Sequence, residues 1–108
     1  MPRYDYGKAM KTTIPAARAA VAQSLSEEHG MSGTDIARRL GIAQAAVSKY
    51  LSGKYSNDVK RGVGFIRSKG IEGRVVESIL SGGNERAIAT LIDKLAARED
   101  LMDTVLRS

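Results

Sequence analysis

Apolar residues recur every three or four positions along most of this chain, and this spacing predicts five to six helices. The first predicted helix runs from Thr13, a candidate cap, to His29. Pro15 suits its first turn, where a missing N–H leaves no hydrogen bond unmade. The inward stripe of this helix is Ala17, Ala20, Val21 and Leu25. Residues 1–12 show no clean period, so we interpret them as an N-terminal arm.

Two short helices joined by a tight turn are predicted in residues 33–52, which read G-T-D-I-A-R-R-L-G-I-A-Q-A-A-V-S-K-Y-L-S. Ser32 or Thr34 can cap the first helix. Gly41 can end it, because a residue without Cβ adopts the left-handed conformation at no steric cost. Ala37 is small enough for the helices to approach closely. The positions predicted to face inward are Ile36, Leu40, Val47 and Leu51.

The outward positions of the second short helix carry polar or small side chains, and such a face suits the major groove of DNA. Glutamine pairs with adenine through two hydrogen bonds, lysine donates to guanine, and alanine packs on the thymine methyl group. Helix pairs with tight turns also occur in bundles that do not bind nucleic acid, but packing alone would not select this set of outward residues. We predict base contacts at Gln44, Ala45, Ser48, Lys49 and Ser52.

The run from Ile36 to Gly53, I-A-R-R-L-G-I-A-Q-A-A-V-S-K-Y-L-S-G, resembles the helix-turn-helix of lambda-repressor-like (XRE-type) DNA-binding proteins. The longer run from residue 14 to residue 54 is similar to a group of small archaeal predicted transcriptional regulators. This resemblance implies an all-α, lambda-repressor-like fold. It also implies a recognition helix that begins near Ala43 and a dimer that acts on a two-fold operator.

The segment after the motif is harder to assign. Val59, Val63 and Ile66 have helical spacing, but Gly62 and Gly64 each disfavour a helix by about 1 kcal/mol relative to alanine. A weak helix and a loop both fit this pattern. A nucleotide-binding loop does not fit, since no G-K-[ST] and no strand accompany the glycines. Simple loop geometry, or close approach of the backbone to DNA phosphates, would account for them.

Residues 71–108 predict further helices with a broad apolar face. A helix from Ile71 to Leu80 ends at two glycines, and Asn84 can cap the next one. The apolar positions in this part are Ile71, Val75, Val76, Ile79, Leu80, Ile88, Leu91, Ile92, Leu95, Leu101, Met102, Val105 and Leu106. The face can pack on the first helix or on a second copy of the chain. We predict a DNA-binding domain in residues 13–70 and a homodimer formed through residues 71–108.

Charge is unevenly distributed, which adds to the DNA prediction. The chain carries a net charge of +5. Residues 54–74 hold six basic and two acidic side chains, whereas residues 75–108 hold four basic and six acidic ones. Basic residues beside a recognition helix favour phosphate binding through counterion release. We predict phosphate contacts at Thr34, Arg38, Lys54, Lys60 and Arg61.

Composition argues against several other functions. The chain has no cysteine and one histidine, His29, which suits a helix C-terminus better than a metal site. The acidic pairs Glu27/Glu28 and Glu99/Asp100 have no general base or metal partner, so we expect neither an enzyme nor a cofactor. No apolar run approaches the roughly 20 residues of a membrane span. We expect a cytoplasmic, nucleoid-associated protein.

These patterns predict a sequence-specific transcriptional regulator that binds double-stranded DNA as a homodimer. The alternative is an architectural or bridging protein that binds DNA without sequence preference and in which the outward face of the second short helix matters little. The two differ in whether a preferred DNA site exists.

Overall fold

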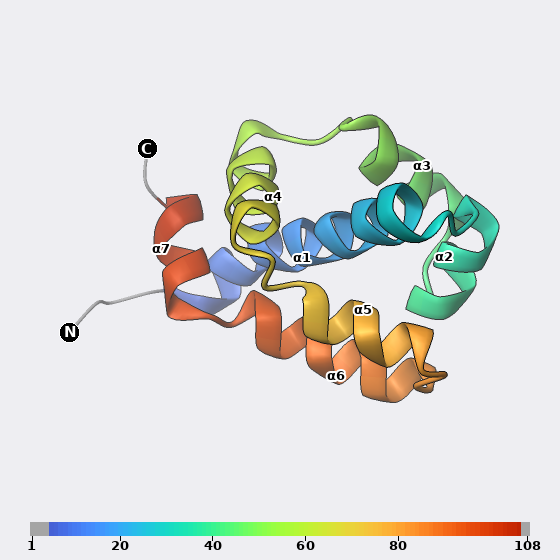
Figure 1. Ribbon diagram of the computed structural model, residues 1–108. Coiled ribbons are helices and arrows are strands. Elements are labelled where there is room, and N and C mark those ends of the chain that lie inside the picture. Colours follow the sequence, from blue (N-terminus) through green and yellow to red (C-terminus); the bar gives the residue numbers. More distant parts are fainter. Residues whose placement is uncertain (1–4, 107–108) are drawn as a thin grey trace.

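The computed structural model describes residues 5–106, which form α-helices and no strand. The all-α prediction is confirmed, with seven helices in place of five to six. They are α1 (Tyr6–His29), α2 (Gly33–Leu40), α3 (Gln44–Ser52), α4 (Asn57–Lys69), α5 (Gly73–Leu80), α6 (Glu85–Ala96) and α7 (Glu99–Leu106). α1 lies in the middle and contacts all six others (Figure 1). None of these helices is long and apolar enough to span a membrane.

The predicted arm is largely helix, so its assignment over residues 6–12 was wrong. α1 begins at Tyr6, where the Asp5 carboxylate accepts a hydrogen bond from the Lys8 amide at 3.0 Å. Thr13 is fully buried inside the helix and does not cap it. Pro15 therefore lies in the helix interior, which typically costs about 3 kcal/mol. Ala9 and Thr13, which are buried just before Pro15, help to offset this cost. Residues 1–4 of the predicted arm lie outside the described residues.

α4 is a continuous helix, so of the two alternatives for residues 59–70 the helix is confirmed and the loop is wrong. Ser56 caps it, accepting a hydrogen bond from the Val59 amide at 3.3 Å. Gly62 is buried, and a Cβ placed there would lie 2.7 Å from the Cβ of Ala16 and 3.0 Å from Cγ1 of Val105. This glycine thus allows α4 to cross α1 and α7 closely. Its packing role is the tertiary effect that overrides helix propensity.

The apolar face of residues 71–108 packs mainly inside the same chain. α6 and α7 lie against α1, and α7 also lies against α4. The buried residues of these two helices are Ile88, Ile92, Leu95, Ala96, Leu101, Met102 and Val105. Leu80 and Leu106, predicted to face inward, are 48% and 46% exposed because they lie at helix ends. The stripe is therefore covered without a second copy, which removes the main argument for a dimer through this region.

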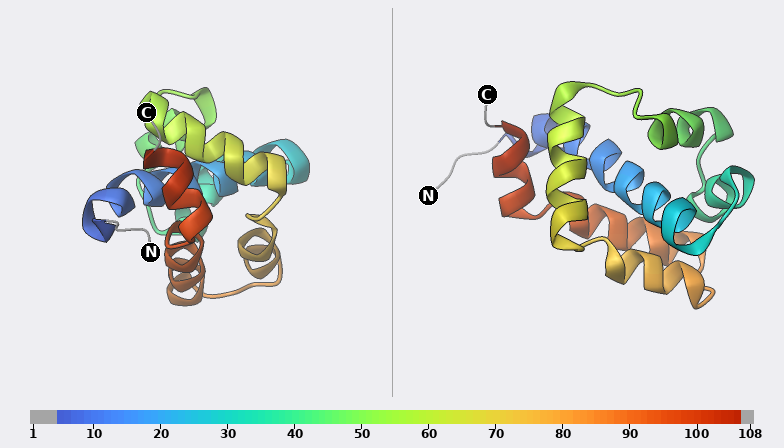
Figure 2. Two further views of the ribbon diagram at one scale, coloured as in Figure 1. Left: turned by 90° about the vertical axis from the view of Figure 1, so that its left-hand side faces the viewer. Right: turned by 45° about the horizontal axis from the view of Figure 1, so that its top comes forward.

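The α5–α6 pair lies across α1 from α3, as both figures show from different directions (Figures 1 and 2). The C-terminal end of α5 is fastened to α2, since Arg39 donates from Nη1 to the Ile79 carbonyl at 2.8 Å. The Asn84 carboxamide caps α6 as predicted, accepting from the Ala87 amide at 2.8 Å. The C-terminal helices thus support α1 and α2 from the side opposite α3.

Candidate nucleic-acid interface

α2, the turn and α3 have the predicted local structure. Ser32 caps α2, with its hydroxyl accepting from the Asp35 amide at 3.1 Å, so Thr34 is not the cap. Gly41 ends the helix at φ 66°, and the Ile42 amide reaches back to the Ala37 carbonyl at 3.0 Å. This closure fixes the angle at which α3 leaves α2.

α3 packs against the rest of the protein through a narrow strip of its surface and exposes the remainder. Its one buried residue is Val47, which is 1% exposed. At about 100° per residue, positions 44, 48, 52, 45 and 49 fall in this order on one arc of about 140°. All five predicted base-contact residues are exposed along that arc: Gln44, Ala45, Ser48, Lys49 and Ser52. The arc therefore offers amide, hydroxyl and ammonium groups together.

Leu51 departs from the predicted core of the two short helices. It is 37% exposed, whereas Ile36, Leu40 and Val47 are buried as expected. Leu51 lies four residues after Val47, about 40° further round the helix. Leu51 is the second-last residue of α3 and lies about 20° from Gln44 round the helix, so it borders the exposed arc. The outward face is thus more apolar at one edge than the sequence indicated.

Thr34 and Gln44, predicted for different contacts, meet at the N-terminal ends of α2 and α3. The Gln44 amide donates from Nε2 to the Thr34 hydroxyl at 2.8 Å. α3 has no side-chain cap, because Ala43 occupies the cap position. Its first backbone amides therefore remain donors next to the Gln44 side chain, an arrangement that suits a phosphate group.

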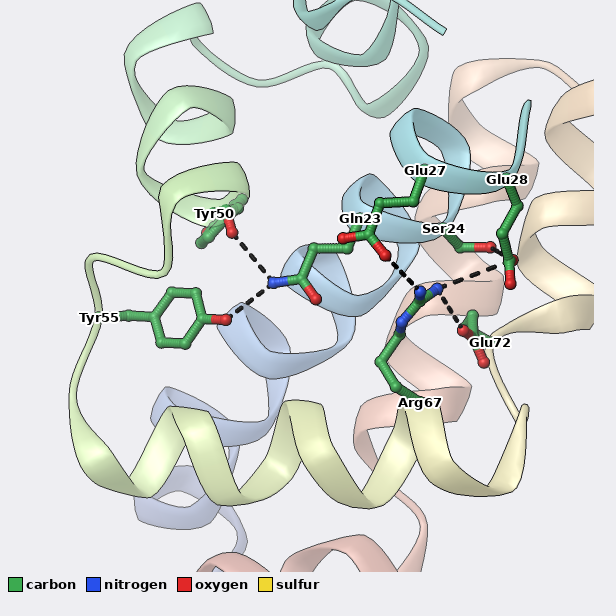
Figure 3. A network of polar contacts seen from close by, with 8 residues as sticks. All are labelled: Gln23, Ser24, Glu27, Glu28, Tyr50, Tyr55, Arg67 and Glu72. Carbon is green, nitrogen blue, oxygen red and sulfur yellow. Dashed lines mark hydrogen bonds and ion pairs between the residues drawn. The ribbon is translucent and has the colours of Figure 1, made fainter. Parts of the chain in front are cut away.

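Gln23 of α1 fastens the C-terminal end of α3, a role that the sequence reasoning missed. Its Nε2 donates to the Tyr50 carbonyl at 3.1 Å and to the Tyr55 hydroxyl at 2.8 Å (Figure 3). Both N–H groups of the amide are thus used. The sequence does hold a signal for this role, because Gln23 is a long polar side chain within a run of small apolar residues in α1. A half-buried polar group at such a position needs hydrogen-bond partners.

The basic residues predicted to contact phosphates differ in whether an acidic side chain of the same chain pairs with them. Lys54 and Lys60 are exposed, and no acidic side chain in the described part of the chain pairs with either. Arg38 pairs with Asp35 at 2.5 Å on an open surface. Arg61 pairs with Asp58 at 2.5 Å and also donates to the Val105 carbonyl of α7 at 3.4 Å. Arg61 is thereby turned partly away from α3.

Arg67 contributes to the basic character of residues 54–74, but its charge is neutralised inside the fold. Its guanidinium lies 3.0 Å from Glu27, 3.8 Å from Glu28 and 3.1 Å from Glu72 (Figure 3). Ser24 donates to Glu28 at 2.6 Å, which lowers the pKa of Glu28, and the Arg67 charge acts in the same direction. This cluster joins α1, α4 and the start of α5, so the net charge of the segment overstates what DNA would meet.

Comparison with known proteins gives one match. A family model described as Helix-turn-helix matches residues 25–59, about a third of the chain, from the end of α1 into α4. No curated protein and no solved structure shows significant similarity. The matched residues include α2, α3 and the whole exposed arc.

Proposed function

We propose that this chain is a sequence-specific transcriptional regulator. The match of residues 25–59 to a helix-turn-helix family model supports this, together with the resemblance of the same residues to lambda-repressor-like (XRE-type) DNA-binding proteins. One observation carries the proposal: the five outward residues of α3 form a single exposed arc opposite Val47. A helix held in this way can enter the major groove with its polar side toward the base edges.

Base reading is assigned to the exposed arc. Gln44 begins the helix and offers a carboxamide that can pair with adenine. Lys49 offers an ammonium group that can donate to guanine, and the Ser48 hydroxyl can donate or accept. Ala45 supplies an apolar contact for a thymine methyl group. Ser52 already donates to the Ser48 carbonyl at 2.8 Å, so it contributes chiefly as an acceptor.

Phosphate binding is assigned to residues around the arc. The N-terminal ends of α2 and α3, with Thr34 and the first amides of α3, hold one phosphate. Lys54 and Lys60 hold others, on the segment that leads from α3 into α4. Arg38 and Arg61 exchange their carboxylate partners for phosphate, which costs little because exposed ion pairs are weak, about 1 kcal/mol or less.

A homodimer on a two-fold site is also part of the proposal. Its contact must use a surface other than the buried stripe of α6 and α7. The described chain exposes four large apolar side chains, each on a different helix, as candidates for that contact: Tyr6, Leu51, Leu80 and Leu106. Two α3 helices would then enter major grooves about 34 Å apart, one helical turn of DNA.

Selection of bound sites from random duplex DNA, at a stated salt concentration, tests the proposal. We expect an enriched motif with two inverted half-sites about ten base pairs apart. If the enriched motif were a single half-site, sequence-specific binding would be supported but the homodimer would be contradicted. The failure of any motif to emerge, with binding that depends only on salt, would replace the proposal with an architectural DNA-binding function.

A further inference from the structure

A groove between α5 and α6 has an apolar floor and a basic rim. This open groove has a volume of about 460 Å³, within the usual range for small-molecule sites. Its floor consists of Val75 and Leu95, both buried, with Ile71 and Leu91 partly exposed at its sides. Arg74, Lys94 and Arg98 complete the lining, together with Gly70. No acidic side chain of the described residues lines the groove.

The rim charges are largely uncompensated. Neither Arg74 nor Lys94 has an acidic partner within the described chain. Arg98 is the exception, because it donates from Nε and Nη2 to Asp100 at 3.0 and 2.9 Å. These hydrogen bonds also raise the pKa of Arg98 and hold its guanidinium in place. Two cations without an acidic partner among the described residues therefore border an apolar floor.

This groove is separate from the proposed DNA interface. α5 and α6 lie across α1 from α3, so a duplex held by the exposed arc of α3 does not reach them (Figures 1 and 2). An anion bound here is therefore not the phosphate backbone of that duplex.

We propose that the α5–α6 groove binds a small organic anion, a carboxylate or sulfonate with an apolar body. Arg74 and Lys94 pair with the anionic group, while Ile71 and Leu91 cover the apolar body. Charge-assisted hydrogen bonds supply orientation, and the removal of apolar surface from water supplies the rest of the affinity. The assignment does not depend on whether α3 reads bases.

Titration of the full chain with 8-anilinonaphthalene-1-sulfonate, followed by its fluorescence, tests the groove directly. The wild type is expected to show one saturable site. Arg74→Gln combined with Lys94→Gln keeps side-chain length and helix propensity but removes both charges, and should weaken binding by about tenfold or more. Arg86→Gln, an exposed arginine of α6 outside the groove, is the matched control and should change binding less than about twofold.

Unchanged affinity in the double variant, or equal losses in the double variant and the control, would overturn the proposal, because the probe would then bind elsewhere or through overall charge alone. Melting temperatures of the three proteins separate lost binding from lost folding. Competition adds a second criterion. Octanoate should displace the probe, whereas acetate and octylammonium at the same concentration should not; displacement by octylammonium would contradict an anion site.

Discussion

α3 and α4 follow one another in the chain, yet the fold holds them in opposite ways. α4 buries four residues, Val59, Gly62, Val63 and Ile66, against α1 and α7. α3 buries Val47 alone and is fastened at its far end by hydrogen bonds from Gln23. The crossing of α1, α4 and α7 thus contributes most to stability. α3, which carries the surface proposed to read DNA, buries little of its own surface against the rest of the protein. Substitutions in the two regions should have separable consequences.

The largest effect is expected from Ile66→Ala in the centre. Ile66 is fully buried, so truncation leaves a cavity and should lower the free energy of unfolding by about 2–5 kcal/mol. Urea unfolding followed by circular dichroism measures the loss. A loss below about 1 kcal/mol would contradict the view that α4 belongs to the stabilising centre.

A matched glycine pair in α4 comes next. Gly62→Ala places a methyl group 2.7 Å from the Cβ of Ala16 and should cost about 1–3 kcal/mol of stability. Gly64→Ala meets no atom within 4 Å and should stabilise by up to about 1 kcal/mol through helix propensity. Thermal unfolding of both variants provides the comparison. Similar melting temperatures would mean that α4 does not cross α1 as closely as described.

Gln23→Met tests how much the hydrogen bonds from Gln23 contribute to holding α3 in place. The substitution keeps side-chain length but removes both donors. We expect a stability loss of about 1–2 kcal/mol, because the Tyr50 carbonyl and the Tyr55 hydroxyl lose a partner. Amide hydrogen exchange should become faster in α3 than in α4. Tyr55→Phe, which removes one of the two contacts, should give a smaller effect. Equal acceleration in both helices would show that the whole fold, and not α3, had loosened.

The smallest effect concerns pH and the start of α7. Hydrogen bonds from Arg98 lower the pKa of Asp100 below its ordinary value of 3.8. Because the folded-state pKa is lowered, this stabilisation is present at neutral pH and is lost as pH falls through the lowered pKa. Asp100 is exposed, so we expect less than about 1 kcal/mol. Unfolding at pH 7 and pH 3 should show a smaller pH difference in Asp100→Asn than in the wild type.

Much of α2, the turn and α3 could be predicted because local rules decide it. Gly41, Ser32 and the spacing of Ile36, Leu40 and Val47 each act within a few residues. α4 and the start of α1 could not be predicted in this way. Gly62 and Pro15 disfavour helix locally, and only contacts with distant helices offset them. For the candidate site, exposure of the α3 arc followed from periodicity, but the roles of Gln23 and Arg67 depend on partners 27 to 40 residues away.

The central claim is that the outward arc of α3 reads bases, and one comparison tests it most directly. Gln44→Ala combined with Lys49→Ala is measured by fluorescence anisotropy on a selected duplex and on its scrambled sequence at one salt concentration. We predict at least about a tenfold loss on the selected duplex and a change of only a few-fold on the scrambled one. Lys60→Gln, as a control, should weaken both duplexes equally. Equal losses on both duplexes in the double variant would contradict base reading by α3.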